Sequence, residues 1–227
     1  MFFHPMDFLI FIAFGISMWA QSKVKGNFVK WSRIESNAGM TGAQVARRIL
    51  NENNLVHIPV RAVRGTLSDH YDPIAREVRL SESVYYGTSI ASISVAAHEV
   101  GHAIQHKEGY SALMIRHRLF PLVNLSSGAA PLLLIGGFIF QWASLIGLGI
   151  LLFSVAVAFQ LITLPVEFNA SSRAKNLMIS TGILRNDEEH GVNKVLGAAA
   201  LTYVAAALIS VLELTKYIMI FNSSNDD

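Results

Sequence analysis

Cysteine is absent from this chain of 227 residues, and charged side chains are scarce. Without cysteine there is no disulfide and no thiolate metal site, so any zinc must be held by histidine and carboxylate side chains. Lys, Arg, Asp and Glu make up 15% of the residues, whereas 52% are hydrophobic. These proportions fit a membrane protein with one modest polar domain. The net charge of +2 is too small to indicate nucleic-acid binding.

Four apolar stretches are candidates for crossing a bilayer. The first, residues 8–20, has no basic start and no obvious cleavage site, which predicts an uncleaved anchor. An uncharged run over residues 119–164 predicts two crossings with a turn at Gln141-Trp142. Residues 195–221 form the fourth stretch. We therefore expect about four transmembrane helices.

The polar residues lie mainly between the first and second of these stretches. Thr41-Gly42-Ala43-Gln44 has the pattern of a capping box and predicts an amphipathic helix after it. Residues 56–63 and 76–80 predict short strands, and residues 69–73 predict a turn. A helix is expected over residues 88–108. The fold class is therefore mainly α, with a small α/β domain.

We divide the chain by these patterns. The expected parts are an N-terminal anchor over 1–21, a polar domain over 22–118, a transmembrane hairpin over 119–164, a helical segment over 165–194, a C-terminal span over 195–221 and a tail over 222–227.

The predicted helix over residues 88–108 contains the pattern His-Glu-x-x-His, at His98, Glu99 and His102. Histidines four residues apart share one face of a helix, so both can bind one zinc ion. Glu99 then stands where its carboxylate can reach a zinc-bound water. The alternative is a polar helix face with two unrelated histidines. The neighbouring residues are apolar, so two histidines and a glutamate would be costly to bury here without a function. His106 continues the spacing, but three positions along one helix cannot all converge on a tetrahedral ion.

A catalytic zinc site needs a third protein ligand. Glu167 follows directly after the uncharged run, where Pro165 can end or kink one helix and a new helix can begin. The other candidates are grouped further on, at Asp187, Glu188, Glu189 and His190. Acidic residues there also suit the first turn of a helix. We favour Glu167.

The chain resembles the YugP-type neutral zinc metallopeptidases, bacterial membrane-bound gluzincins distantly similar to the HtpX peptidases. The resemblance covers nearly the whole chain. Five segments carry it: residues 68–73 (Ser-Asp-His-Tyr-Asp-Pro), 84–87 (Val-Tyr-Tyr-Gly), 96–106 around the two zinc histidines, 164–171 around Glu167, and 198–203 (Ala-Ala-Ala-Leu-Thr-Tyr).

The resemblance implies zinc at His98, His102 and Glu167, with Glu99 as the base that activates the zinc-bound water. It also implies a membrane-embedded endopeptidase that hydrolyses membrane or membrane-proximal proteins, so the expected partners are the lipid bilayer and a protein or peptide substrate. Wider gluzincins usually carry Asp four residues after the third ligand. Ser171 occupies that position here, so the contact to a zinc histidine must be weaker, or must come from Asn169 or elsewhere.

Peptide hydrolysis also needs a donor for the developing oxyanion. His70, Tyr203 and Arg173 are the candidates. We favour Tyr203 or His70, and no spacing argument chooses between these two. Each of the three also has a purely structural explanation: His70 as a turn residue, Tyr203 as a side chain that packs between helices, and Arg173 as a solvated charge. A strand just before the zinc helix could pair with an extended peptide, or could be an ordinary hairpin strand.

Two alternatives to an enzyme come from other classes. A non-catalytic zinc-binding membrane scaffold or adaptor would keep the metal but would have no need of Glu99. A transporter or channel fits poorly, because nearly all charged residues lie outside the apolar spans.

The sidedness is predicted from basic residues near the spans. They gather after the first span, before the second, and between the third and fourth: Lys23, Lys25, Lys30, Arg33, Arg116, Arg118, Arg173, Lys175, Arg185 and Lys194. Basic residues mark the cytoplasmic side. We expect a protein of the bacterial inner membrane whose zinc site faces the cytoplasm.

Overall fold

The computed structural model describes residues 4–223. They divide into two compact units. Unit 1 takes its residues from 1–19, 111–165 and 202–227, and unit 2 consists of residues 20–110 and 166–201. Of the predicted tail, only Asn222 and Ser223 are described, and both belong to the last helix.

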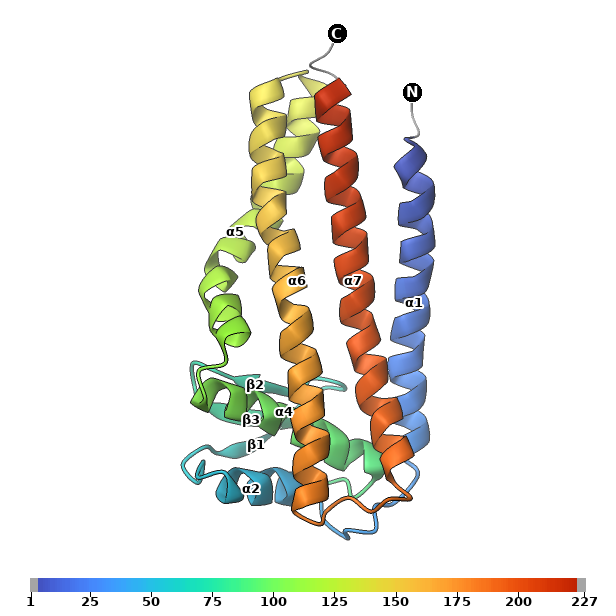
Figure 1. Cartoon of the computed structure of the whole chain (residues 1–227), viewed down its shortest axis with the longest axis vertical. Helices are drawn as coiled ribbons and strands as arrows, with labels where there is room; N and C mark the ends of the chain where they lie inside the picture. The colour runs from blue at the N-terminus through green and yellow to red at the C-terminus, as the bar shows by residue number, and fades with distance from the viewer. Residues whose placement is uncertain (1–3, 224–227) are drawn as a thin grey trace. The chain divides into compact units, whose positions relative to one another are not determined.

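Four helices of the described chain are long and apolar enough to cross a membrane: α1 (Pro5–Trp31), α5 (Ser111–Ile139), α6 (Ala143–Ser180) and α7 (Glu189–Ser223). The expectation of about four spanning helices is confirmed, and Figure 1 shows all four as long ribbons. The turn between α5 and α6 contains Gln141, as predicted, in a left-handed conformation with φ of 51°. The first helix is longer than the predicted anchor and continues to Trp31.

Helix α6 corrects one expectation. Pro165 lies inside it, and the helix runs without a break from Ala143 to Ser180. Proline removes one backbone hydrogen bond, but helices in apolar surroundings tolerate it because neighbouring groups and local adjustments satisfy the freed carbonyl. Glu167 is therefore carried by the third long helix itself, and no separate helix begins there.

Within unit 1, glycines allow α5 and α6 to approach closely. A Cβ at Gly137 would lie 2.8 Å from the backbone nitrogen of Ile146, and one at Gly149 would lie 2.8 Å from Leu134 Cγ. Small residues at such crossings are typical of helices that pack within membranes.

Unit 2 contains the remaining elements. These are α2 (Gly42–Glu52), β1 (Val60–Val63), β2 (His70–Asp72), β3 (Glu77–Ser81), α3 (Glu82–Tyr85) and α4 (Ile90–Lys107). The sheet has the order β1-β3-β2, with β1 parallel and β2 antiparallel to β3. Helix α4 packs against α2 and also contacts β2 and β3.

The strand boundaries differ from the sequence predictions for identifiable reasons. The expected strand over 56–63 is shortened to Val60–Val63, because Arg47 donates to the carbonyls of Val56 and Ile58 and holds them in a turn. The expected turn over 69–73 is instead strand β2. The chain reverses one step later, where Asp72 Oδ1 accepts the amides of Ile74 and Ala75 at 2.8 and 2.9 Å.

The core of unit 2 follows from the predicted amphipathic helix. Thr41 and Gln44 form the capping box that starts α2. The apolar face of α2 (Val45, Ala46, Ile49 and Leu50) is fully buried. Helix α4 begins at the Ser89 cap, whose side chain accepts from the Ser92 amide, and it is buried along most of its length.

At Gly101 the backbones of α4 and α6 approach each other closely. A Cβ placed there would lie 2.7 Å from the carbonyl oxygen of Ala170 and 3.3 Å from its Cα. Ala170 and Ala174 on α6 are themselves fully buried. The two helix backbones meet here only because the side chains at the crossing are small.

We expect Gly101→Ala to lower the free energy of unfolding by about 1–3 kcal/mol, the usual cost of overpacking a core, because the new methyl group meets backbone atoms. The measurement is the thermal unfolding midpoint of the detergent-purified protein. Gly197→Ala on α7 is the matched control, since nothing lies within 4 Å of the added Cβ and alanine favours helices. Equal midpoints for both variants would contradict the close approach.

Candidate metal centre

Three side chains of unit 2 converge on one point: His98 and His102 from α4, and Glu167 from α6. Their candidate ligand atoms all lie within 4.8 Å of one another. Glu167 Oε2 is 3.3 Å from His98 Nε2 and 3.6 Å from His102 Nε2. Two atoms bonded to one tetrahedral zinc at about 2.0–2.1 Å lie about 3.4 Å apart. Two imidazoles and one carboxylate at these separations fit zinc and leave a fourth position open.

The other ring nitrogen of each histidine is occupied. His102 Nδ1 donates to Gln105 Oε1 at 3.0 Å, and His98 Nδ1 lies 3.2 Å from Ser171 Oγ. These contacts favour the tautomer that keeps the proton on Nδ1 and leaves the Nε2 lone pair free for a metal. Ser171 therefore supplies the contact that Asp supplies in wider gluzincins, through a neutral and weaker hydrogen bond.

Gln105 is held in turn by α6. Its amide nitrogen donates to the carbonyl of Val166 at 2.8 Å and to Asn169 Oδ1 at 2.9 Å. Arg173 donates to the same Asn169 oxygen at 2.7 Å. Because the amide nitrogen has two acceptors, the Gln105 oxygen must face His102. Asn169 thus acts on the histidine through Gln105.

Glu99 follows the first histidine and is 8% exposed. Burial raises the pKa of Glu99 to about 7, and the nearby Glu167 and Asp69 add to the rise, while His98 and the backbone amide of Tyr71 oppose it. A divalent cation at the three ligands would favour the ionised carboxylate and so lower this pKa. The environment suits a carboxylate that exchanges a proton near neutral pH.

His106 lies outside the ligand cluster, as expected from its spacing. Its Nδ1 is 2.9 Å from the Tyr71 hydroxyl. Burial lowers the pKa of His106, and Arg76 lowers it further. The neutral ring can then accept a hydrogen bond from the Tyr71 hydroxyl, which links strand β2 to the end of α4.

The alternative third ligands are engaged elsewhere. Glu188 is buried, and its carboxylate accepts the backbone amides of Asn37 and Arg185 at 2.8 and 3.2 Å. Glu189 pairs with Lys175, and the His190 ring stacks edge-on against Trp31. Asp187 accepts from the Asn37 side chain at 3.3 Å.

The three candidate oxyanion donors have different settings. His70 is exposed on β2, and its Nδ1 lies 2.8 Å from the Ser68 carbonyl. Arg173 is not a solvated charge, because it binds Asn169 and pairs with Glu108 at 2.7 Å. Tyr203 belongs to unit 1. The roles of His70 and Tyr203 stay predictions.

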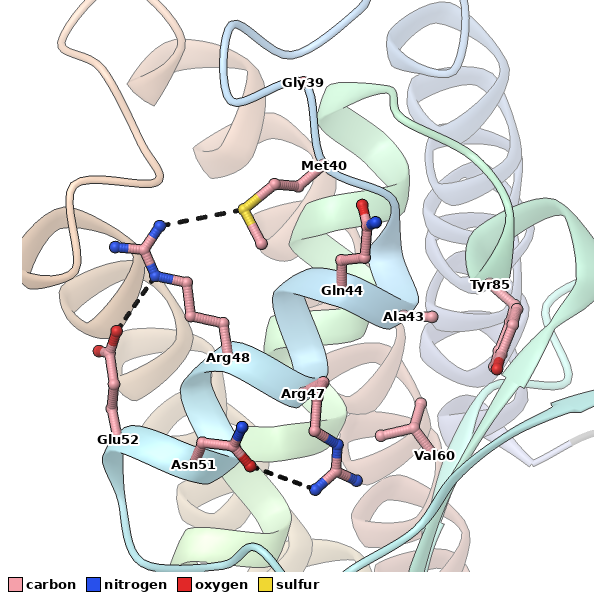
Figure 2. A pocket seen from close by; sticks show the side chains of 10 residues that line it. All are labelled: Gly39, Met40, Ala43, Gln44, Arg47, Arg48, Asn51, Glu52, Val60 and Tyr85. Atoms are coloured by element: carbon pink, nitrogen blue, oxygen red, sulfur yellow. Dashed lines mark hydrogen bonds and ion pairs between the residues drawn. The ribbon is translucent and has the colours of Figure 1, made fainter.

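An open hollow of about 840 Å³ lies along α2, and Figure 2 shows the residues that line it. None of His98, His102 and Glu167 is among them. Its two arginines already bind their own chain: Arg47 holds Asn51 and the carbonyls noted above, and Arg48 pairs with Glu52 at 3.1 Å and donates to the Thr181 carbonyl at 2.6 Å. This hollow is therefore separate from the candidate metal centre.

Sequence reasoning assigned no role to Gln105 or Tyr71. A signal for Gln105 was present, since a fully buried amide in an apolar helix, three residues after a zinc histidine, must bind something. No local pattern pointed to Tyr71, because its partners come from a helix about thirty residues further along the chain.

Comparison with known proteins agrees with this geometry. Residues 6–222 match the family described as "Putative neutral zinc metallopeptidase". The chain is 63% identical over 220 residues to the "Putative membrane protease YugP" of Bacillus subtilis (strain 168), covering 97% of this chain and 98% of that protein. No solved structure matches the chain. The chain belongs to the neutral zinc metallopeptidase family, and it is a metallopeptidase with a zinc cofactor and membrane-spanning helices.

Proposed function

We propose that this protein is a membrane-embedded zinc endopeptidase that cleaves membrane or membrane-proximal proteins. The observation that carries the proposal is the convergence of His98, His102 and Glu167, with the buried Glu99 beside them. The four candidate spans restrict the substrates to proteins that reach the membrane. A non-catalytic scaffold is the less favoured alternative, because a purely structural zinc site has no use for Glu99.

The chemistry divides between the metal and the chain. Zinc bound by His98, His102 and Glu167 would supply a Lewis acid for the scissile carbonyl. Glu99 accepts a proton from the attacking water and later passes it to the leaving amine. The backbone amide of Tyr71 favours the ionised form of Glu99 and so lowers its pKa. Gln105 and Ser171 keep the histidine rings in the geometry that binds the metal.

Strand β2 is the proposed substrate-binding edge. The last strand before α4 is β3. It lies between β1 and β2, so its paired residues have no free backbone edge to which a peptide could bind. Strand β2 pairs with β3 on one side only, and α4 contacts it. An extended peptide could add to the outer edge of β2 by backbone hydrogen bonds and pass close to Glu99.

We expect Glu99→Gln to retain zinc and to lower turnover at least about 100-fold, the usual scale for a lost general base. The measurements are zinc content by mass spectrometry and cleavage of proteins in a membrane extract, followed by peptide sequencing. Glu82→Gln, at an exposed carboxylate on α3, is the control and should match wild type. Near-normal turnover of the Glu99 variant would remove the proposed mechanism.

We expect Glu167→Gln to weaken zinc binding at least about 100-fold, because a neutral amide replaces the only anionic ligand. Competition with a chelator measures the affinity directly, without any substrate. Glu189→Gln is the matched control, since its carboxylate is exposed and pairs with Lys175. Glu188 is a poorer control, because it is buried and holds two backbone amides. Unchanged zinc affinity in the Glu167 variant would show that the ligand set is wrong.

The proposed orientation places the zinc site on the cytoplasmic side of the bacterial inner membrane. Helix α5 and the first part of α6 separate His102 from Glu167, so an even number of crossings keeps the ligands on one side. Ten basic residues lie beside the spans on that side, whereas Lys216 lies near the opposite end of α7.

The chain has no cysteine, so single cysteines test this orientation. Thr66, Ser180 and Ser223 are exposed positions, and intact cells carrying each variant are treated with a membrane-impermeant maleimide. We expect labelling only at position 223, and labelling at all three positions after the membrane is permeabilised. Labelling of intact cells at 66 and 180 would reverse the orientation, and labelling at only one of these two would contradict a shared side for the ligands.

A further inference from the structure

Unit 1 contains a cavity that the proposed peptidase mechanism does not use. Its volume is about 220 Å³, and it is lined by residues of α5, α6 and α7, among them Leu134, Phe138, Phe153, Glu213 and Tyr217. Pro131 completes the α5 wall, where the helix lacks one backbone N–H. All of these residues belong to unit 1, so the cavity is complete within that unit.

The cavity has one anionic group. Glu213 is half-buried and lies ten residues before the end of α7, which is about 15 Å along the helix axis. No residue of the described chain, 4–223, gives its carboxylate a hydrogen bond or an ion pair. A carboxylate within an apolar span is costly without a partner, and such groups usually mark a functional site.

The nearest cation in sequence is already engaged. Lys216 is three residues after Glu213, a spacing that lets helical side chains pair. Its ammonium instead binds Asp7 Oδ1 of α1 at 2.8 Å. Asp7 therefore holds Lys216, which makes no ion pair with Glu213. The Lys216 ammonium also lies 5.5 Å from the Tyr217 ring centroid, and its charge acts on the Glu213 carboxylate from that position.

Three aromatic rings line the cavity together with Glu213. The Tyr217 ring lies 5.6 Å from Phe153 and 6.4 Å from Phe138, measured between ring centroids. Aromatic faces attract cations most strongly where water is excluded. A carboxylate beside three rings is the chemistry that recognises an organic ammonium group.

We infer that this cavity binds the ammonium head of an amphiphilic amine, with Glu213 as its counter-ion and Phe138, Phe153 and Tyr217 as its aromatic walls. The volume is below the roughly 300–1,000 Å³ of ordinary small-molecule pockets. It accommodates the head group and a few methylenes, so the apolar tail lies outside among the lipid chains. The site is separate from the zinc ligands in sequence and chemistry, and it does not depend on the proposed peptidase activity.

The test uses photolabelling of the full-length protein in phosphatidylglycerol nanodiscs, which contain no ammonium lipid. The probe is dodecylamine with a diazirine near its amine, and mass spectrometry locates the label. We expect labels on residues 131–138, 153 and 213–217, with at least about a tenfold loss in Glu213→Gln. The matching diazirine alcohol should label wild type and variant equally.

A second variant tests whether the loss of labelling in Glu213→Gln comes only from a structural change at residue 213. Asp7→Asn leaves Glu213 intact but frees Lys216 to pair with it, so we expect labelling by the amine to fall here too. Thr215→Ala, on the same helix and exposed, should label as wild type does. Competition separates the sources: added phosphatidylethanolamine should block the label if a lipid head group fills the site, whereas only unlabelled dodecylamine should block it if free amines do.

Equal labelling of wild type and Glu213→Gln would overturn the inference, and the cavity would then hold only water or lipid chains. Labels that map outside the cavity residues would overturn it as well. Undiminished labelling of Asp7→Asn would refute the role given to the Asp7–Lys216 pair.

Discussion

The close approach of α4 and α6 at Gly101 is the contact on which the metal centre depends. His98 and His102 stand on either side of Gly101 on α4, and Glu167 stands one turn before Ala170 on α6. A larger side chain at position 101 would separate the backbones and so move the carboxylate away from the imidazoles. The small residues beside His98 and His102 thus also allow α6, which is distant in sequence, to pack close to the two histidines.

The same crossing supports the outer contacts of the site. Ser171 and Asn169 come from α6, Gln105 comes from α4, and their hydrogen bonds fix both imidazole rings with Nε2 toward Glu167. A neutral serine replaces the carboxylate used in wider gluzincins, and a buried glutamine supports the second histidine. Both hydrogen-bonding groups are neutral, which suits a site where the Glu99 carboxylate already experiences the charges of Glu167 and Asp69.

The apolar helices serve two kinds of chemistry in this chain. Helix α6 is one of the four candidate spans, and because it continues through Pro165 the same helix also carries Glu167, a residue of unit 2. Helix α7 likewise carries an acidic side chain, Glu213, into unit 1. The two carboxylates have different neighbours. Glu167 lies beside the histidines, whereas Glu213 lines a cavity with aromatic walls. Lys216, three residues after Glu213, pairs with Asp7.

The sequence by itself determined the membrane class, the number of spans, the helix that carries His98, Glu99 and His102, and the capping box of α2. These features depend on local composition and on spacings within one helix, which a sequence displays directly. The tertiary structure decided which carboxylate lies beside the two histidines, that Gln105 and Ser171 contact their rings, that β2 is the edge strand on the α4 side of β3, and that Arg47 shortens β1. Those outcomes depend on contacts between residues far apart along the chain, whose free energy arises from packing and pairing that no local pattern encodes.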